Sequence, residues 1–280
     1  MPAWSTRMRI ALMAVLLLVA AAGVRAEEAY VFAVVPQYEQ RKLYSIWKPI
    51  VDDVARRSGV PLRLAATLTV TDFERGLSRG SFDFVYANPY HVLVESRRQG
   101  YIPLVRDANP LTGVLVVARD GPIRSIADLD GKTLAVPSPN ALGASLLLRS
   151  DLEQIHNVRM RMLDVKTHSS VYLNVAKGIA DAGGGVQKTL AEQDERLQGA
   201  LRILYATRAM PSHPVAAHPR VARPAREAVR QALLELAATP AGRALLADVP
   251  MLLPVRASLD DYLVMREWGL EKYWVEVPQE

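Results

Sequence analysis

Cysteine is absent from the 280-residue sequence. The protein therefore forms no disulfide, has no cysteine nucleophile and carries no lipid on an N-terminal cysteine. Other catalytic signatures are missing too: the chain has no GxSxG elbow and no HExxH motif, and its five histidines are scattered without metal-ligand spacing. We accordingly expect a protein that is not an enzyme and that holds neither a metal nor a cofactor.

The sequence also lacks a strong charge of either sign. Its 34 lysines and arginines are set against 29 aspartates and glutamates, and the basic residues are not clustered with aromatic ones. This pattern argues against nucleic acid as a partner. A mildly basic surface suits a small anion, although a solvated, arginine-rich surface explains the same excess.

Long apolar runs are confined to the N-terminus. Residues 1–26 place Arg7 and Arg9 before the apolar run IALMAVLLLVAAAG and end on VRA, with the small residue Ala26 at the cleavage position. This order is typical of a secretory signal peptide. The run is short for a membrane span, which needs about 20 residues, and an uncleaved anchor is the alternative. We expect cleavage near Ala26 and a soluble protein in a bacterial periplasm.

What the rest of the chain does contain is a regular alternation of strand-like and helix-like stretches. About 254 residues remain after cleavage, enough for one large or two medium domains. Strands are expected at 29–35, 61–68, 82–89, 112–120, 131–137, 158–165, 179–185 and 201–207, and helices lie between most of them. This alternation predicts an α/β fold with mainly parallel sheets, followed by a mostly helical C-terminal third. Pro49 predicts that the first helix begins near it or kinks there.

Several motifs, spread in order from about residue 31 to 220, carry a resemblance to a known family. They are VVPQ, WKPIVDDVARRSGV, FDFVYANPYHV, GVLVVARDGPIRSIADLDGKTLAVPSPN, HSSVYLNVAKGIADAG and MPSHPV. With these motifs the chain resembles the phosphate/phosphite/phosphonate-binding proteins of ABC importers, which have the type II periplasmic solute-binding fold. Each motif alone is a weak signal. Their common order behind a signal peptide is what makes the resemblance specific.

The resemblance implies two lobes, each a mainly parallel sheet flanked by helices, that close over a small anionic ligand. After a signal peptide at 1–26, the first lobe would comprise residues 27–112 and 213–280, and the second lobe residues 113–212. Hinge crossings would lie near LTGVLVV and MPSHPVAA. The ligand would be phosphate- or phosphonate-related, or another small oxyanion, and the protein, a monomer, would deliver it to an ABC permease. The alternative is a binding protein that reports to a membrane sensor instead.

The loop at 137–143 is the first candidate for the ligand. A strand there leads into a helix whose first N–H groups are unpaired, and such a helix start attracts anions. The family's phosphonate binders carry hydroxyl side chains after a Pro-Asn pair, whereas here Asn140 is followed by Ala141, Leu142 and Gly143. Asn140 is expected either to cap the helix alone or to cap it and contact the ligand.

The other family positions match unevenly. His168 is retained, Phe73 replaces an aromatic hydroxyl, and Gln187 and His213 fall where aminophosphonate binders place acidic residues. Among loop residues after strands, Tyr86 and Asn88 are expected to contact the ligand, with core filling and turn stabilisation as the alternatives. The predicted ligand-binding set is Tyr38, Thr71, Tyr86, Asn88, Asn140, Ala141, Leu142, Gly143, His168, Gln187 and His213.

A histidine and a glycine run are two further candidates. His91 follows Pro89 and Tyr90 at an expected helix start, and we interpret it as a surface or capping residue rather than a ligand contact. The AGGG stretch at 182–185 is either a site of close backbone approach or a flexible turn.

Overall fold

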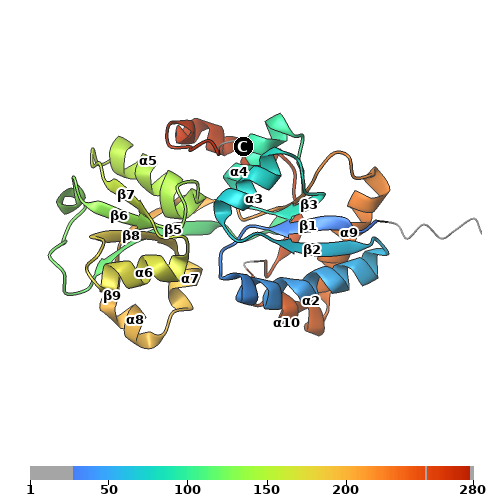
Figure 1. Cartoon of the computed structure of the whole chain (residues 1–280), viewed down its shortest axis with the longest axis horizontal. Coiled ribbons are helices and arrows are strands. Elements are labelled where there is room, and N and C mark those ends of the chain that lie inside the picture. Colours follow the sequence, from blue (N-terminus) through green and yellow to red (C-terminus); the bar gives the residue numbers. More distant parts are fainter. Residues whose placement is uncertain (1–27, 250, 278–280) are drawn as a thin grey trace, which may run out of the picture.

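The computed structural model describes residues 28–249 and 251–277, so the expected signal peptide lies outside the described residues. Two β-sheets, each covered by helices, lie side by side (Figure 1). We call each sheet with its helices a lobe. The predicted α/β class and two-lobed type II architecture are confirmed.

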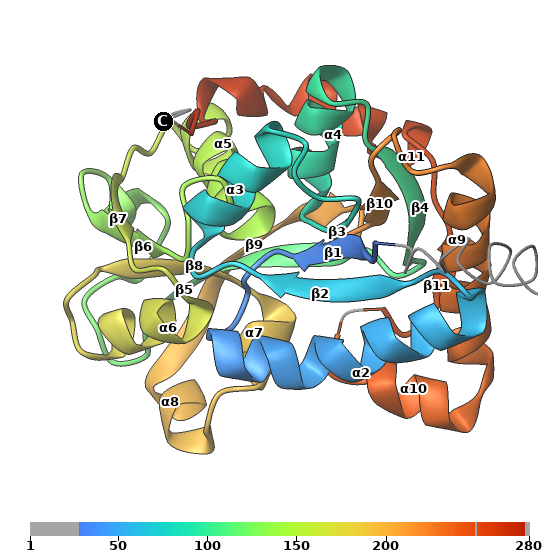
Figure 2. The same cartoon turned by 45° about the vertical axis from the view of Figure 1, so that its right-hand side comes forward.

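The first lobe contains a six-stranded sheet in the order β11-β4-β10-β3-β1-β2. Its strands are β1 (Tyr30–Val34), β2 (Leu62–Ala66), β3 (Phe84–Tyr86), β4 (Ile102–Asp107), β10 (Val215–Ala217) and β11 (Pro254–Arg256). Helices α2 (Gln40–Ser58), α9 (Arg223–Ala238) and α10 (Pro240–Leu246) cover one face, and α3 (Val70–Ser78) and α4 (Pro89–Arg98) lie on the other (Figure 2). The apolar stripe of α2, including Trp47 and Val54, is buried in this core.

The second lobe contains a five-stranded sheet in the order β7-β6-β8-β5-β9. Its strands are β5 (Leu111–Ala118), β6 (Thr133–Val136), β7 (Arg161–Asp164), β8 (Ala182–Val186) and β9 (Leu201–Met210), and its helical segments are η1 (Ala127–Leu129), η2 (Leu142–Leu146), α5 (Leu147–Gln154), α6 (His168–Ala176), α7 (Gln187–Ala191) and α8 (Glu195–Ala200). Along β5, Val114 and Val116 enter one core while Leu115 and Val117 enter another. Because side chains alternate along a strand, one apolar run fills both faces of the sheet.

The expectation of mainly parallel pairing is corrected by the strand register. Among the described strands, β1 with β2, β1 with β3, β6 with β7 and β6 with β8 are parallel. The five other pairings, which involve β5, β9, β10 and β11, are antiparallel. The chain comes directly from the other lobe into β5 and into β10. The direction of these two strands is therefore set by the crossing between the lobes and not by a βαβ connection. The sheets are therefore mixed.

Pro49 does not mark the start of the first helix, because α2 begins at Gln40 and continues through Pro49. A proline inside a helix leaves the carbonyl four residues earlier without its N–H partner. Both Pro49 and Ser45, which carries that carbonyl, are exposed. Water can satisfy the free carbonyl, so the helix tolerates the proline.

The AGGG stretch is neither a turn nor a loop; it forms most of the buried strand β8. A Cβ built on Gly184 would lie 1.8 Å from the carbonyl oxygen of Ala144, and one on Gly185 would lie 2.1 Å from the Tyr172 hydroxyl. The glycines thus allow η2 and α6 to pack directly on the strand.

Two segments carry the chain between the lobes, 107–111 and 210–215, and they are bonded to each other. Ser212 Oγ donates to the carbonyl of Asp107 at 2.7 Å, and Leu111 pairs with Met210. The buried Asp107 carboxylate accepts the N–H groups of Asn109 at 2.7 Å and Leu253 at 2.9 Å. The predicted lobe boundaries near 112 and 212 stay a proposal consistent with this path.

Residues 257–277, the C-terminal segment, touch both lobes. This segment contains α11 (Asp260–Leu263), η3 (Val264–Trp268) and η4 (Leu270–Lys272), and it lies over α4 and α5 (Figures 1 and 2). Its side chains form a separate apolar core together with side chains of α4, η2 and α5. The buried residues of this core are Tyr90, Leu93, Leu142, Leu146, Leu147, Met210, Ala257, Tyr262, Met265, Leu270 and Tyr273. Polar contacts reinforce it, including Ser150 Oγ to the Trp268 carbonyl at 3.0 Å and Lys272 Nζ to Glu153 at 2.7 Å.

Candidate functional site

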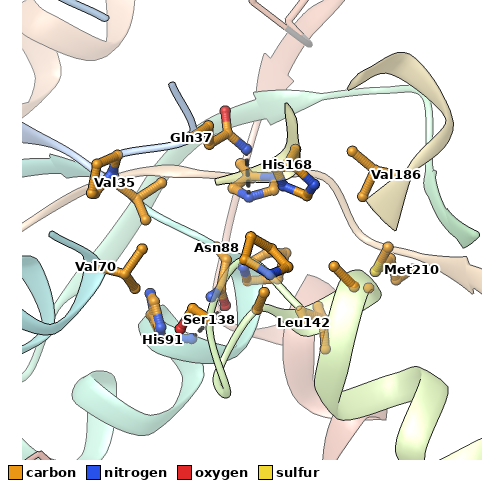
Figure 3. Close-up of a pocket in the computed structure, with 17 residues that line it drawn as sticks. Val35, Gln37, Val70, Asn88, His91, Ser138, Leu142, His168, Val186 and Met210 are labelled. Carbon is orange, nitrogen blue, oxygen red and sulfur yellow. Dashed lines mark hydrogen bonds between the residues drawn. The ribbon is translucent and has the colours of Figure 1, made fainter. Parts of the chain in front are cut away.

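A small pocket lies between the lobes, where β1, β3 and β6 deliver the chain into loops (Figure 3). Its volume is about 50 Å³. One water needs roughly 10–15 Å³ on the same measure, so the pocket has room for a molecule of only a few heavy atoms. It is lined by Val35, Pro36, Gln37, Val70, Asn88, Pro89, His91 and His213 on one side and by Pro137, Ser138, Ala141, Leu142, Gly143, Ala144, His168, Val186 and Met210 on the other.

Four helices begin at this pocket. Val70, Pro89 and His168 are the first residues of α3, α4 and α6, and Leu142 begins the continuous helical run of η2 and α5. The first N–H groups of a helix have no carbonyl partner within it, and the aligned peptide dipoles place partial positive charge there. Helices from both lobes therefore direct positive potential into one small space.

The side chains that line the pocket include no aspartate, glutamate, lysine or arginine among the described residues. The polar groups are three imidazoles, two amides and one hydroxyl, and the remainder is apolar. The histidines do not form a metal centre: within 28–249 and 251–277, no group of histidine and acidic side chains could hold a metal ion. The positive potential of the pocket consequently comes from the dipoles of the helices that begin there.

The three imidazoles have different surroundings. His91 is 1% exposed, and its Nε2 lies 2.8 Å from Glu74 Oε1. Burial lowers the pKa of His168 to about 4. Burial, together with repulsion from His91 and His168, lowers the pKa of His213 to about 3. His168 and His213 are therefore neutral in the unliganded protein near pH 7.

The interpretation of His91 as a surface or capping residue is wrong. Its backbone N–H does bond to the N-cap side chain of Asn88, at 2.9 Å. Its ring, however, points into the interior, where it lies against Trp274 and is held by Glu74. Glu74 belongs to α3, and no local pattern in the sequence indicates that α3 packs against α4.

Asn140 bonds to the C-terminal segment. Its Nδ2 donates to the Val275 carbonyl at 2.8 Å, and its Oδ1 accepts the Val275 N–H at 2.9 Å. Its own carbonyl accepts Asn88 Nδ2 at 3.2 Å. It makes no side-chain cap of η2, whose N-cap is Ala141, so the expectation of capping is wrong. Asn140 is also not among the residues that line the pocket.

The structure brings six of the predicted site residues to the pocket: Asn88, Ala141, Leu142, Gly143, His168 and His213. Tyr38 and Thr71 line a neighbouring hollow of about 70 Å³ that shares Pro36, Val70, Pro137 and Ser138 with the pocket. There the Tyr38 hydroxyl donates to Glu192 of the second lobe at 2.9 Å. Whether any of these residues touches a ligand stays a prediction.

Tyr86, Gln187 and Phe73 lie elsewhere. Tyr86 is fully buried behind His213, with the two rings stacked 5.4 Å apart. Phe73 is also fully buried and stacks on Phe82, so it presents no edge to the pocket. Gln187 is exposed at the start of α7.

The pocket residues that sequence reasoning missed include Gln37 and Ser138. Gln37 follows β1 and Ser138 follows β6, at the carboxyl ends of parallel strands. Loops at these ends form the ligand-facing edge of open α/β sheets. The prediction chose Tyr38 and Asn140 from these two loops; applying the rule to every polar residue of each loop would have found Gln37 and Ser138 as well.

Two lobes joined by two crossings around a buried pocket define the class of two-lobed ligand-binding proteins. Within this class, the model of the family described as ABC transporter, phosphonate, periplasmic substrate-binding protein matches residues 32–262. The chain therefore belongs to this family of periplasmic binding proteins, as the resemblance of its motifs predicted. The comparison with curated proteins found no match.

Solved structures agree on the fold. A binding protein component of an ABC phosphonate transporter from Pseudomonas aeruginosa is 16% identical with a TM-score of 0.79, over 87% of this chain and 86% of that one. PhnD1 from Prochlorococcus marinus, in complex with methylphosphonate, is 13% identical with a TM-score of 0.78, over 88% and 98%. A Xanthomonas citri protein bound to chloride ion is 18% identical with a TM-score of 0.74, over 88% and 98%. At these identities the similarity shows a common fold alone.

Across residues 28–249 and 251–277, every helix is too short or too polar to span a bilayer.

Proposed function

We propose that the protein binds a small oxyanion in the pocket between its lobes and delivers it to an ABC importer. The observation that carries this proposal is the meeting of four helix N-termini, from both lobes, at a pocket without acidic side chains. Oriented N–H groups and helix dipoles are what proteins use to bind phosphate-like groups. Because the family is described as part of ABC transporters, we favour an importer over a sensor as the partner of this protein.

The size and lining of the pocket narrow the ligand class. A volume of about 50 Å³ fits an anion of a few heavy atoms, such as phosphate, phosphite or methylphosphonate. The ammonium group of an aminophosphonate would find no carboxylate among the described lining residues. The apolar surfaces of Leu142, Val70 and Met210 suit a ligand with a hydrogen or methyl group in place of one oxygen. Methylphosphonate is bound by the similar Prochlorococcus marinus protein and chloride by the Xanthomonas citri one.

The two lobes would close on the ligand by a population shift. Residues from both lobes line the pocket, so all contacts form only when the lobes are together, and binding favours that state. A permease would then recognise the closed form. Residues 1–26 would direct the chain to the periplasm and be removed near Ala26, which intact-mass measurement on periplasmic extract tests.

Thermal shift and small-angle scattering with a ligand panel test the binding function. The panel contains phosphate, phosphite, methylphosphonate, aminoethylphosphonate, sulfate, acetate and chloride. A compound at a hundredfold excess over its dissociation constant stabilises the folded protein by about 2.7 kcal/mol, and the radius of gyration should fall with it. We expect phosphite or methylphosphonate to give the largest shift and aminoethylphosphonate to give little. If no compound changes either quantity, the proposed function is refuted.

A further inference from the structure

The pocket presents an electrostatic problem for any anion that enters it. None of its described lining side chains is a lysine or arginine, so no permanent cation faces the ligand. The four helix termini each supply about half a unit of positive charge, but that charge is spread over several N–H groups and its effect falls off within the first turn, so none of them acts as a localised cation. A buried anion without a full counter-charge is strongly disfavoured, and protonation is the usual way in which such a site restores neutrality.

Two side chains in the lining can provide that counter-charge. His168 and His213 are 8% and 9% exposed, and the Nδ1 atom of each ring is buried without a hydrogen-bond partner in the described structure. Buried polar atoms are almost always paired, so an unpaired atom at a pocket indicates a partner that is not part of the chain. The two rings come from different segments, α6 and the crossing at 210–215.

The groups around the pair favour one proton at most. His91 lines the same pocket and its Nδ1 is also unpaired, but its Nε2 is bonded to Glu74, so a carboxylate already lies against that ring. Tyr86 stacks on His213 with its hydroxyl unpaired, and a π face tolerates an imidazolium. Gln37 Nε2 lies 3.4 Å from His213 Nε2, and a flipped amide would present its oxygen to a protonated ring. His168 opens α6, where the helix dipole disfavours positive charge.

We propose that the His168–His213 pair takes up one proton together with the oxyanion, so that the cargo is held as a charge-balanced pair. This inference rests on the proposed function and adds that the anion and one proton bind together. A second proton is excluded because two imidazoliums in one small pocket would repel each other, and the two rings titrate as a coupled pair.

The expected electrostatic energies agree with joint binding of an anion and a proton. The unliganded rings hold protons weakly, because burial lowers both pKa values. One negative charge about 4 Å away favours an imidazolium by roughly a thousandfold at the effective dielectric constant of a protein site. With the anion bound, the histidine pair is therefore expected to carry a proton between about pH 5 and 7. The affinity for the anion should then rise up to about tenfold for each pH unit of acidification.

Calorimetry in two buffers of different ionisation enthalpy measures the protons taken up on binding. The probes are methylphosphonate and sulfate, since the charge of sulfate does not change between pH 5 and 8. We expect about one proton per ligand beyond the ligand's own ionisation in the wild type, and about none in the double variant His168→Gln with His213→Gln. His156→Gln, a matched change of a half-buried histidine outside the pocket, should retain the wild-type value.

The outcomes separate the two proposals. If neither probe nor any other member of the panel binds, the proposed function fails. If a ligand binds to the wild type with no proton beyond its own ionisation, and with an affinity that does not rise on acidification, the inference alone is overturned. It is also overturned if the double variant binds and takes up the same proton. If the double variant does not fold or bind, the proton count of the wild type decides.

Discussion

At the scale of single residues, His168 has the most direct consequence for binding. It is the first residue of α6, lines the pocket and has an unpaired ring nitrogen. Removing a hydrogen bond to a charged partner costs about 1.5–3 kcal/mol. His168→Ala should therefore weaken binding of the panel ligand by roughly tenfold to a hundredfold, measured by calorimetry. His156→Ala is the control, and an unchanged affinity in His168→Ala would remove this residue from the site.

The residue scale is also where the sequence was least informative. Asn88, Ala141 and Gly143 could be placed at the pocket because they follow strands or begin helices, and those features are local. Tyr86 was expected to contact the ligand, with core filling as the alternative, and the structure favours the alternative: Tyr86 ends β3 with its side chain in the core, while Asn88, two residues on, lies beyond the strand. The pairing of His91 with Glu74 depends on how two helices pack, which no local pattern contains.

At the scale of elements, the glycines of β8 set how closely the second lobe packs. Gly184→Ala would place a methyl group 1.8 Å from the Ala144 carbonyl, so η2 or the strand must move. We expect a loss of about 1–3 kcal/mol in the free energy of unfolding, measured by urea denaturation. Gly199→Ala in α8 is the control, since nothing lies within 4 Å of its added Cβ, and alanine favours a helix. Equal stability of the two variants would contradict this account.

The C-terminal segment offers a second element-scale prediction. Asn140→Ala removes both side-chain bonds to the backbone of Val275 and leaves those groups without their partner. The expected loss of stability is about 1–3 kcal/mol. Asn174→Ala serves as the comparison, because among the described residues its amide donates to Ser170 of its own helix, and it should lose less than half as much. A larger effect at Asn174 would show that the attachment at Val275 contributes little.

Most helices and strands in which apolar residues recur at regular spacing could be predicted from the sequence. The strands that could not be predicted lack such a pattern. The strands at 30–34, 62–66, 111–118 and 133–136 were expected because apolar runs specify them, and all but 62–66 contain β-branched residues. β10 and β11 have only three residues each, and β4 carries Pro103, Arg106 and Asp107. These strands exist because neighbouring strands pair with them, and that stabilisation is not encoded locally.

At the scale of the whole molecule, the buried histidines make stability depend on pH. An unfolded histidine has a pKa of about 6.5, whereas those of His168 and His213 are lowered to about 4 and about 3. Between these values the unfolded chain binds more protons than the folded protein, so the contribution of the two histidines to stability falls as the pH falls below about 6.5 and is constant above it. His168 alone accounts for roughly 3 kcal/mol by pH 4.

Urea denaturation of the ligand-free protein at pH 7, 5.5 and 4.5 measures this dependence. The double variant His168→Gln with His213→Gln should lose less stability on acidification than the wild type. The same slope in both proteins would mean that other groups titrate instead. Because an oxyanion favours the protonated pair, saturating ligand should also flatten the wild-type dependence.

The C-terminal segment limits how the lobes can move. Two covalent crossings that are bonded to each other act as one hinge line, about which the lobes could both open and twist. The segment adds a third point of attachment away from that line, because it packs on α4 of one lobe and α5 of the other. Three attachments that do not lie on one line leave fewer degrees of freedom than two. If the lobes open and close as proposed, opening must either follow a single path about a fixed axis or first release Val275 from Asn140. The proposed permease would then meet one reproducible closed geometry.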